Sequence, residues 1–216
     1  LVGNSMGGLI SILQAADHPG AVAGLVLVDP ALPVSLTTRP DLRVAATFAA
    51  YAVPAVGRAV LSRRRRTMTA EESAHDLLAL VSEDPSRIPV DVVDQHVALA
   101  SRRRSYADVD DELITAARSL MFVLADRRKY AAMQRSIGAP VLLLHGDRDR
   151  LVPIASARSA ARANPTWQFE VAEGVGHVPQ LEVPEWTAGH ILGWLAAHPG
   201  AAATAALARP RRGATP

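Results

Sequence analysis

The chain has 216 residues, of which 49% are hydrophobic and 20% charged, and its formal net charge is +2. This length can bury the core of one domain together with an excursion from it. Aromatic residues make up only 4% of the chain, and acids follow both arginine runs, at 63–66 and 102–104. Solvated helix faces therefore explain the basic residues better than a nucleic-acid-binding surface, and we expect no nucleic-acid partner.

The composition also excludes two kinds of feature from these residues, cysteine-based sites and membrane-spanning helices. The chain contains no cysteine, so disulfides and thiolate metal sites are absent from these residues. No stretch reaches the roughly 18 uninterrupted apolar residues of a membrane-spanning helix. We expect no membrane span, and a cytoplasmic location is the default. Because secretion signals sit at an N-terminus and the first residue here is leucine, that default says nothing about a signal peptide.

The first residues predict a sharp turn from a strand into a helix. Leu1-Val2 is typical of the end of a buried strand, and the apolar spacing of the residues after Ser5 predicts a helix that stops at His18-Pro19-Gly20. Ser5 is the centre of the G-x-S-x-G pentapeptide between them. We expect Ser5 to be strained, with Gly3 and Gly7 letting strand and helix approach closely.

A second strand, ending Gly24-Leu25-Val26-Leu27-Val28-Asp29, follows this helix, and the βαβ order favours a parallel sheet. Residues 33–118 break the pattern. Prolines divide this stretch into expected helices at about 41–52, 54–62, 70–82, 89–101 and 108–125, with no strand among them. The segment Arg127-Arg128-Lys129-Tyr130 begins or lies on a helix that returns to the sheet.

The remaining residues return to alternating strands and helices. A strand at 141–145 ends in the carboxylate-rich turn Gly146-Asp147-Arg148-Asp149, and a helix follows at 154–163. A strand at 167–172 leads into the loop that contains His177, and a helix at 184–197 completes the core. From Pro199 the chain is rich in Ala, Pro, Arg and Gly, which predicts a disordered tail.

Three motifs in order, the G-x-S-x-G elbow, the G-D-x-D-x-x-V-P turn and the G-H-x-P-Q-L-E loop, resemble the α/β-hydrolase family. The family's triad runs nucleophile, acid, histidine. The resemblance therefore implies Ser5 as nucleophile, Asp149 as acid and His177 as base, with the backbone N–H of Met6 as one oxyanion donor. The reaction that this triad implies needs no cofactor and no metal.

The resemblance also implies the architecture, an α/β fold that forms the C-terminal part of an α/β-hydrolase parallel sheet with an inserted helical lid. The implied division is hydrolase core at 1–32, lid at 33–118, core at 119–198 and tail at 199–216. The family's first strands, and the loop with the second oxyanion donor, would precede residue 1. We therefore expect these residues alone to be inactive and poorly soluble, with an unpaired apolar edge along Leu1-Val2.

Other residues compete for the same roles. Asp147 is expected to brace its loop through hydrogen bonds or an arginine. Some members of this fold carry the acid where Asp29 stands, although an aspartate before Pro30 more often caps its own turn. His145 ends an apolar strand, which favours a packed, hydrogen-bonded core residue over a catalyst.

The favoured function is a serine hydrolase that cleaves a carboxylic ester, thioester or related acyl substrate of modest size through an acyl-enzyme on Ser5. Its expected partner is a small-molecule acyl substrate, and the oligomeric state is left open. One alternative is a hydrolase of carbon-carbon bonds in ring-fission products, whose members share the spelling G-N-S-M-G-G but usually have tryptophan where Val178 follows the histidine. A truncated, non-catalytic hydrolase-like module is the other.

Overall fold

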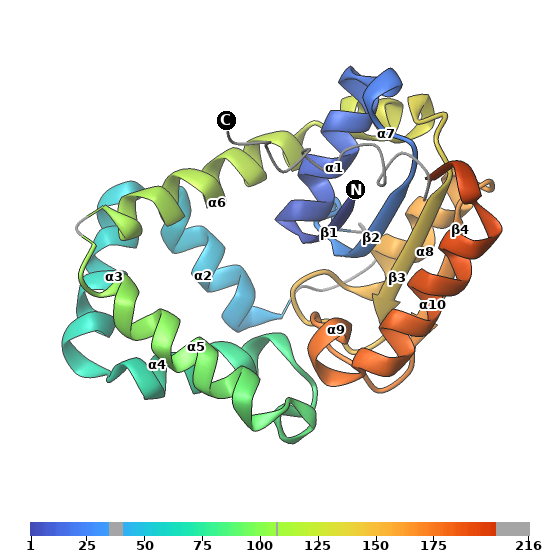
Figure 1. Cartoon of the computed structure of the whole chain (residues 1–216). Helices are drawn as coiled ribbons and strands as arrows, with labels where there is room; N and C mark the ends of the chain where they lie inside the picture. The colour runs from blue at the N-terminus through green and yellow to red at the C-terminus, as the bar shows by residue number, and fades with distance from the viewer. Residues whose placement is uncertain (35–40, 107, 202–216) are drawn as a thin grey trace, which may run out of the picture.

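The computed structural model describes residues 1–34, 41–106 and 108–201. Its centre is a parallel sheet of four strands in the order β1-β2-β3-β4 (Figure 1). The strands are β1 (Val2–Ser5), β2 (Leu25–Pro30), β3 (Val141–Gly146) and β4 (Gln168–Ala172). The predicted parallel sheet is confirmed. Strand β1 is one of its two outer strands, with Leu1 and Val2 exposed as expected.

Helices cover both faces of the sheet, which explains why every residue of β2 and β3 is buried and why most of them are apolar. Helices α1 (Met6–Asp17), α7 (Arg127–Ser136) and α8 (Ile154–Ala163) share a core with Leu27 and Leu143. Helix α10 (Pro184–Ala197) packs through Trp194 against Val26 and Leu142 on the opposite face. Neighbouring residues of one strand thus enter different cores, as the alternation of side chains requires.

The middle of the chain forms a group of helices beside the sheet (Figure 1). They are α2 (Leu42–Ala52), α3 (Pro54–Thr67), α4 (Ala70–Val81), α5 (Val90–Arg103) and α6 (Val109–Ala125), with the short helix η2 (Pro85–Arg87) between α4 and α5. Two other short helices, η1 (Pro19–Ala21) and α9 (Pro179–Glu182), lie outside this group. No strand occurs in the described part of 33–118, as predicted. The suggested boundary at residue 118 falls inside α6, and the predicted tail lies outside the described residues from 202 onward.

The expected end of α3 at residue 62 is wrong. The helix continues to Thr67 because arginine is a good helix former and the run Arg63 to Arg66 finds partners. Arg64 pairs with Asp76 of α4 at 2.5 Å, and Arg65 pairs with Asp110 of α6 at 2.9 Å. The arginine run therefore ties neighbouring helices together as well as facing solvent.

None of the described helices is by itself long and apolar enough to cross a membrane. Taken together, α2 and α3 meet the length and composition test, but they are bent by 119° where they join.

The pairing of β1 with β2 contains a bulge at the end that bears the candidate residues. Asn4 is opposite Val28 and Ser5 is opposite Pro30, so Asp29 is an extra residue in β2. Asp29 has a φ of 41°, and Ser5 has a φ of 53°. These are the two described residues other than glycine with positive φ, and they lie on neighbouring strands. The predicted strain at Ser5 is confirmed.

The turn at Ser5 depends on one of the two glycines that the pattern suggested. A Cβ on Gly3 would lie 2.4 Å from the backbone oxygen of Gly7, so only glycine fits there. A Cβ on Gly7 would meet nothing within 4 Å, and the expectation that its small size is needed is wrong. The second tight position is Gly8, where a Cβ would lie 2.7 Å from Cβ of Pro30.

We predict that Gly3→Ala destabilises the fold by about 2 to 4 kcal/mol, because backbone must shift to admit the methyl group. Gly7→Ala is the matched control, and it should be neutral or slightly stabilising because alanine favours helix. Urea unfolding of the whole protein measures both free energies. Equal effects of the two substitutions would contradict the assignment.

Candidate active site

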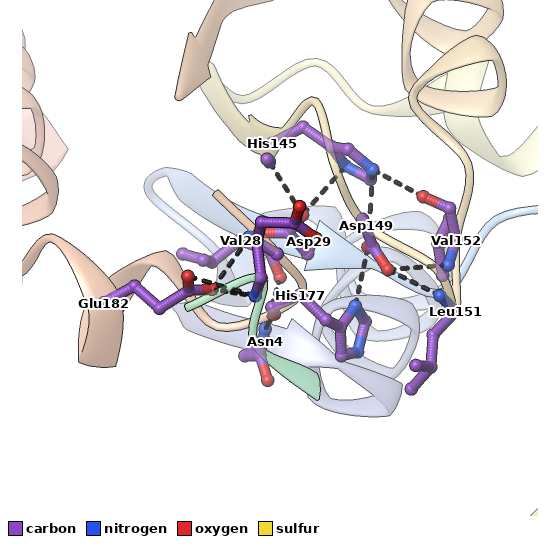
Figure 2. Close-up of polar contacts among 12 residues, drawn as sticks. Asn4, Val28, Asp29, His145, Asp149, Leu151, Val152, His177 and Glu182 are labelled. Carbon is purple, nitrogen blue, oxygen red and sulfur yellow. Dashed lines mark hydrogen bonds and ion pairs between the residues drawn. The ribbon is translucent and has the colours of Figure 1, made fainter. Parts of the chain in front are cut away.

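The candidate residues gather at the carboxyl edge of the sheet. Ser5 ends β1, Asp29 lies near the end of β2, Asp149 follows β3 and His177 follows β4. Because all four strands run parallel, their carboxyl ends meet at one edge. Figure 2 shows Asp149 lying between the rings of His145 and His177.

A short hydrogen bond joins the predicted acid to the predicted base. Nδ1 of His177 lies 2.7 Å from Oδ2 of Asp149, and both side chains are buried. The other carboxylate oxygen, Oδ1, accepts the backbone N–H groups of Leu151 at 2.7 Å and Val152 at 2.9 Å (Figure 2). Burial acts to raise the pKa of Asp149, but the hydrogen bond and charge of His177, together with His145 and the N–H of Val152, outweigh it, and the net shift is downward.

The protonation of the His177 ring follows from this contact. A carboxylate can only accept, so Nδ1 carries the proton and Nε2 of the neutral ring is left with a lone pair. Nε2 is buried and has no hydrogen-bond partner among the described residues. It is therefore free to accept a proton. No hydrogen bond to Ser5 is formed, which is common in unliganded catalytic sites.

Two further parts of the chain, besides Asp149, hold His177 in place. Its backbone N–H donates to the carbonyl of Val81, at the end of α4, at 2.7 Å. Its backbone carbonyl accepts from the side-chain amide of Asn4, which also donates to Val28 (Figure 2). Asn4 thus ties the histidine loop to β1 directly beside Ser5. Sequence reasoning assigned Asn4 no role, because its partners are remote in sequence.

Glu182 is a second residue that sequence reasoning missed. It is 3% exposed, and its carboxylate accepts backbone N–H groups from Gly176, Glu83 and Asp84 at 2.8 to 3.2 Å. A buried carboxylate with these donors fastens the histidine loop to the residues after α4. A Cβ on Gly176 would lie 2.7 Å from N of Glu83, which shows how closely the two segments pack. The available signal was the acid in G-H-x-P-Q-L-E.

The structure confirms the roles that we expected for Asp147 and His145 but not the role expected for Asp29. Asp147 accepts the N–H of Gly174 at 2.7 Å and lies 3.8 Å from Arg148, which confirms its bracing role. His145 is fully buried, and its Nε2 lies 2.8 Å from the carbonyl of Val152, so it is the packed residue that was expected. The turn-capping role expected for Asp29 is wrong. The bulge turns Asp29 toward β3, and its Oδ1 accepts the N–H of Gly146 at 2.9 Å.

Asp29, His145 and Asp149 also form a group whose potential ligand atoms lie within 4.8 Å of one another. All three are buried. The Asp149 oxygen that faces the group is already bonded to His177, and a metal ion there would compete with that bond. We therefore assign no metal and no cofactor to these residues.

An apolar cavity of about 350 Å³ opens beside Ser5. Its wall combines the end of β2 with helices α2 and α6 and with the turn that follows Asp149. The lining includes Val44, Phe48, Met121, Leu124 and Leu151, and Arg127 is the only charged residue among its described lining residues. A pocket of this size and character suits a small hydrophobic group held next to the serine hydroxyl.

Comparison with known proteins agrees with this arrangement. A family model described as the alpha/beta hydrolase fold matches residues 1–184. Lipase 1 of Psychrobacter immobilis is 26% identical over 187 residues, which cover 86% of this chain and 52% of that protein. Monoglyceride lipase of Homo sapiens is 27% identical over 197 residues, which cover 87% and 54%.

The fold is shared with solved structures as well. A thermophilic esterase from Thermogutta terrifontis superposes with a TM-score of 0.62 at 24% sequence identity, over 92% of this chain and 65% of that one. At this identity the likeness concerns the fold alone. The chain spans about half the length of the curated relatives it matches.

We predict that Glu182→Gln destabilises the fold by about 1 to 3 kcal/mol, because an amide replaces one of the oxygens that accept buried N–H groups. The loop that carries His177 should loosen with it, so amide hydrogen exchange at residues 174–178 should accelerate. The control is Glu185→Gln, on the exposed first turn of α10. If both variants exchange like the wild type, Glu182 does not anchor the loop.

Proposed function

The chain belongs to the α/β-hydrolase family, and from this premise we propose that it is a serine hydrolase that cleaves a carboxylic ester, thioester or related acyl bond. One observation carries the proposal. A serine with a φ of 53° lines an apolar cavity, at the same sheet edge as a buried His177–Asp149 pair joined at 2.7 Å. The lipases among its relatives support hydrolysis of esters at the level of the family.

In the proposed reaction Nε2 of His177 accepts the proton of the Ser5 hydroxyl as the oxygen attacks the acyl carbon. Asp149 stabilises the imidazolium through Nδ1 and keeps the ring in the required tautomer. The imidazolium then protonates the leaving alcohol or thiol, which departs and leaves an acyl group on Ser5. Water, activated by the same nitrogen, releases the acid and restores the serine.

The tetrahedral intermediates carry a negative oxygen that needs N–H donors. Met6 begins α1 directly after Ser5, so its backbone N–H is one of the unpaired donors at a helix N-terminus. We propose it as one oxyanion donor. The family's second donor comes from the loop after its third strand, and we propose no residue for that role here.

The cavity suggests an acyl or alkyl group of modest size. Its volume of about 350 Å³ is near the lower end for ligand pockets, and its polar groups are few. Because α2 and α6 supply part of the wall, we propose that the helical segment between β2 and α7 acts as a lid that shapes this pocket. Val178, where carbon-carbon hydrolases of ring-fission products usually have tryptophan, disfavours that alternative.

We predict that Ser5→Ala and His177→Ala each lower ester turnover of the whole protein by about 1000-fold or more, and that the double variant is little worse than either. Steady-state assays with an activated short-chain ester and fluorophosphonate labelling measure both effects. Asp149→Asn should be far more damaging than Asp147→Asn. Additive losses, or an inactive Asp29→Asn with an active Asp149→Asn, would contradict the assignment.

We predict that Phe48→Trp shifts acyl preference toward shorter chains, because the larger ring fills part of the cavity. The ratio of kcat/KM for a long ester to that for a short one should fall about 10-fold. Phe122→Trp is the matched control, since Phe122 is 83% exposed on α6 and does not line this cavity. An unchanged ratio in Phe48→Trp would mean that the acyl group lies elsewhere.

A further inference from the structure

Asp29 is a buried carboxyl with few hydrogen-bond donors, and it has no role in the proposed triad. It is fully buried, and its oxygen Oδ2 has no hydrogen-bond partner among the described residues. The other oxygen accepts a single N–H, from Gly146. A buried ionised carboxylate with one donor is costly, because burial removes the water that would otherwise solvate the charge.

The groups that face Asp29 make ionisation still less favourable. From the turn after β3 comes Asp149, itself the acceptor of a hydrogen bond from His177. From α9 comes Glu182, a second buried carboxylate that acts on Asp29 by its charge. Neighbouring β1 contributes the uncharged Asn4, which bonds to Val28. The nearby arginines of the turn are engaged elsewhere, Arg148 with Asp147 and Arg150 with Glu83.

His145 supplies no proton to Asp29 either. Burial lowers the pKa of His145, so the ring is neutral and has one N–H. Nε2 lies 2.8 Å from the carbonyl of Val152, which can only accept, so the proton is on Nε2. Nδ1 is therefore a bare acceptor, and it lies 3.6 Å from Oδ1 of Asp29 (Figure 2). Acceptor atoms of three buried groups, Asp29, Asp149 and His145, thus lie within 4.8 Å of one another.

Resting on the proposed function, we propose that Asp29 keeps its carboxyl proton at neutral pH and donates it in a hydrogen bond to the Asp149 carboxylate, which makes Asp29 a positioning residue for the triad acid. The proton sits on Oδ2, the oxygen without another partner, and stays there throughout the reaction. Asp149 then holds the negative charge alone and is fixed from two sides, by Asp29 and by His177.

The direction of the Asp29 ionisation equilibrium agrees with the geometry. Burial, followed by the charge of Asp149, raises the pKa of Asp29 well above its usual range, and the single backbone donor at Gly146 opposes this only in part. The folded state therefore binds a proton that the unfolded chain releases above about pH 4. Its contribution to stability is present in acid and is lost as the pH rises toward the folded-state pKa.

Asp29→Asn is the decisive variant. Asparagine tolerates the positive φ at this position, and it reproduces the neutral carboxylic acid with an acceptor for Gly146 and a donor for Asp149. Asp29→Gly also tolerates the backbone but removes the donor. Asp147→Asn is the matched control, because it neutralises a half-buried carboxylate in the turn after β3, the turn that carries Asp149.

Two measurements on the whole protein need no turnover. The infrared difference between wild type and Asp29→Asn at about pH 7 should contain the C=O band of a protonated carboxyl, and Asp147→Asn should not remove that band. Between about pH 5 and about pH 8 the Tm of Asp29→Asn should rise relative to wild type, since only wild type must hold the proton. No band, or a difference in Tm that does not grow with pH, would overturn the proposal.

The pH–rate profile tests the link to catalysis. If Asp29 is neutral, Asp29→Asn leaves the acidic limb of kcat/KM in place and keeps kcat within about threefold, whereas Asp29→Gly lowers kcat about 10-fold with little change in KM. An acidic limb shifted down by about one pH unit in Asp29→Asn would mean that a negative charge had been removed, and would overturn the proposal. Equal damage from both substitutions would also overturn it.

The outcomes separate this proposal from the proposed function. An inactive wild type with the infrared band present would reject the hydrolase and keep the proton on Asp29. An active wild type that depends on Ser5 but lacks the band would do the reverse. If Asp29→Gly does not fold, the infrared band and the acidic limb of Asp29→Asn still show whether Asp29 is protonated.

Discussion

The charge on Asp149 is the constraint on which the rest of the site depends. Taking a carboxylate out of water costs several kcal/mol, on the order of the stability of a small domain, unless hydrogen bonds replace the lost hydration. Asp149 is supplied by two backbone N–H groups of its own turn and by His177. The tight turn after β3, the placement of the histidine loop and the tautomer of the ring all follow from satisfying this one group.

The same loop is held from outside the sheet, which couples the helical segment to the candidate base. The backbone of His177 is bonded to Val81 at the end of α4, and Glu182 fastens Gly176 to Glu83 and Asp84. A movement of these residues away from the sheet would break hydrogen bonds at the histidine itself. If the helical segment acts as the proposed lid, a movement of α4 away from the sheet would therefore also move His177.

The features that could be predicted from the sequence are those that depend on short, local residue patterns. The strand-to-helix turn at Ser5, the acidic turn at Asp149 and the order of the motifs needed only short stretches of chain. The errors arose where partners are remote. Asp29 looked like a turn cap because the bulge that redirects it depends on its pairing with β1. Glu182 had no role because two of its three donors, Glu83 and Asp84, lie about 100 residues away. Glycine is needed at position 3 and not at position 7 because the backbone of α1 passes close to Cα of Gly3, and this approach is visible only in the folded chain.

The division of labour between Asp29 and Asp149 follows from counting donors. Both carboxyls are buried at the carboxyl ends of neighbouring strands, and two negative charges at such a separation cannot both be maintained. Asp149 has three N–H donors and Asp29 has one, so the charge is favoured on Asp149 and the proton on Asp29. The position after β3 thereby becomes the acid that can polarise His177. The carboxyl at the end of β2 is retained as a neutral donor, and its proton fixes the Asp149 carboxylate from the side opposite His177.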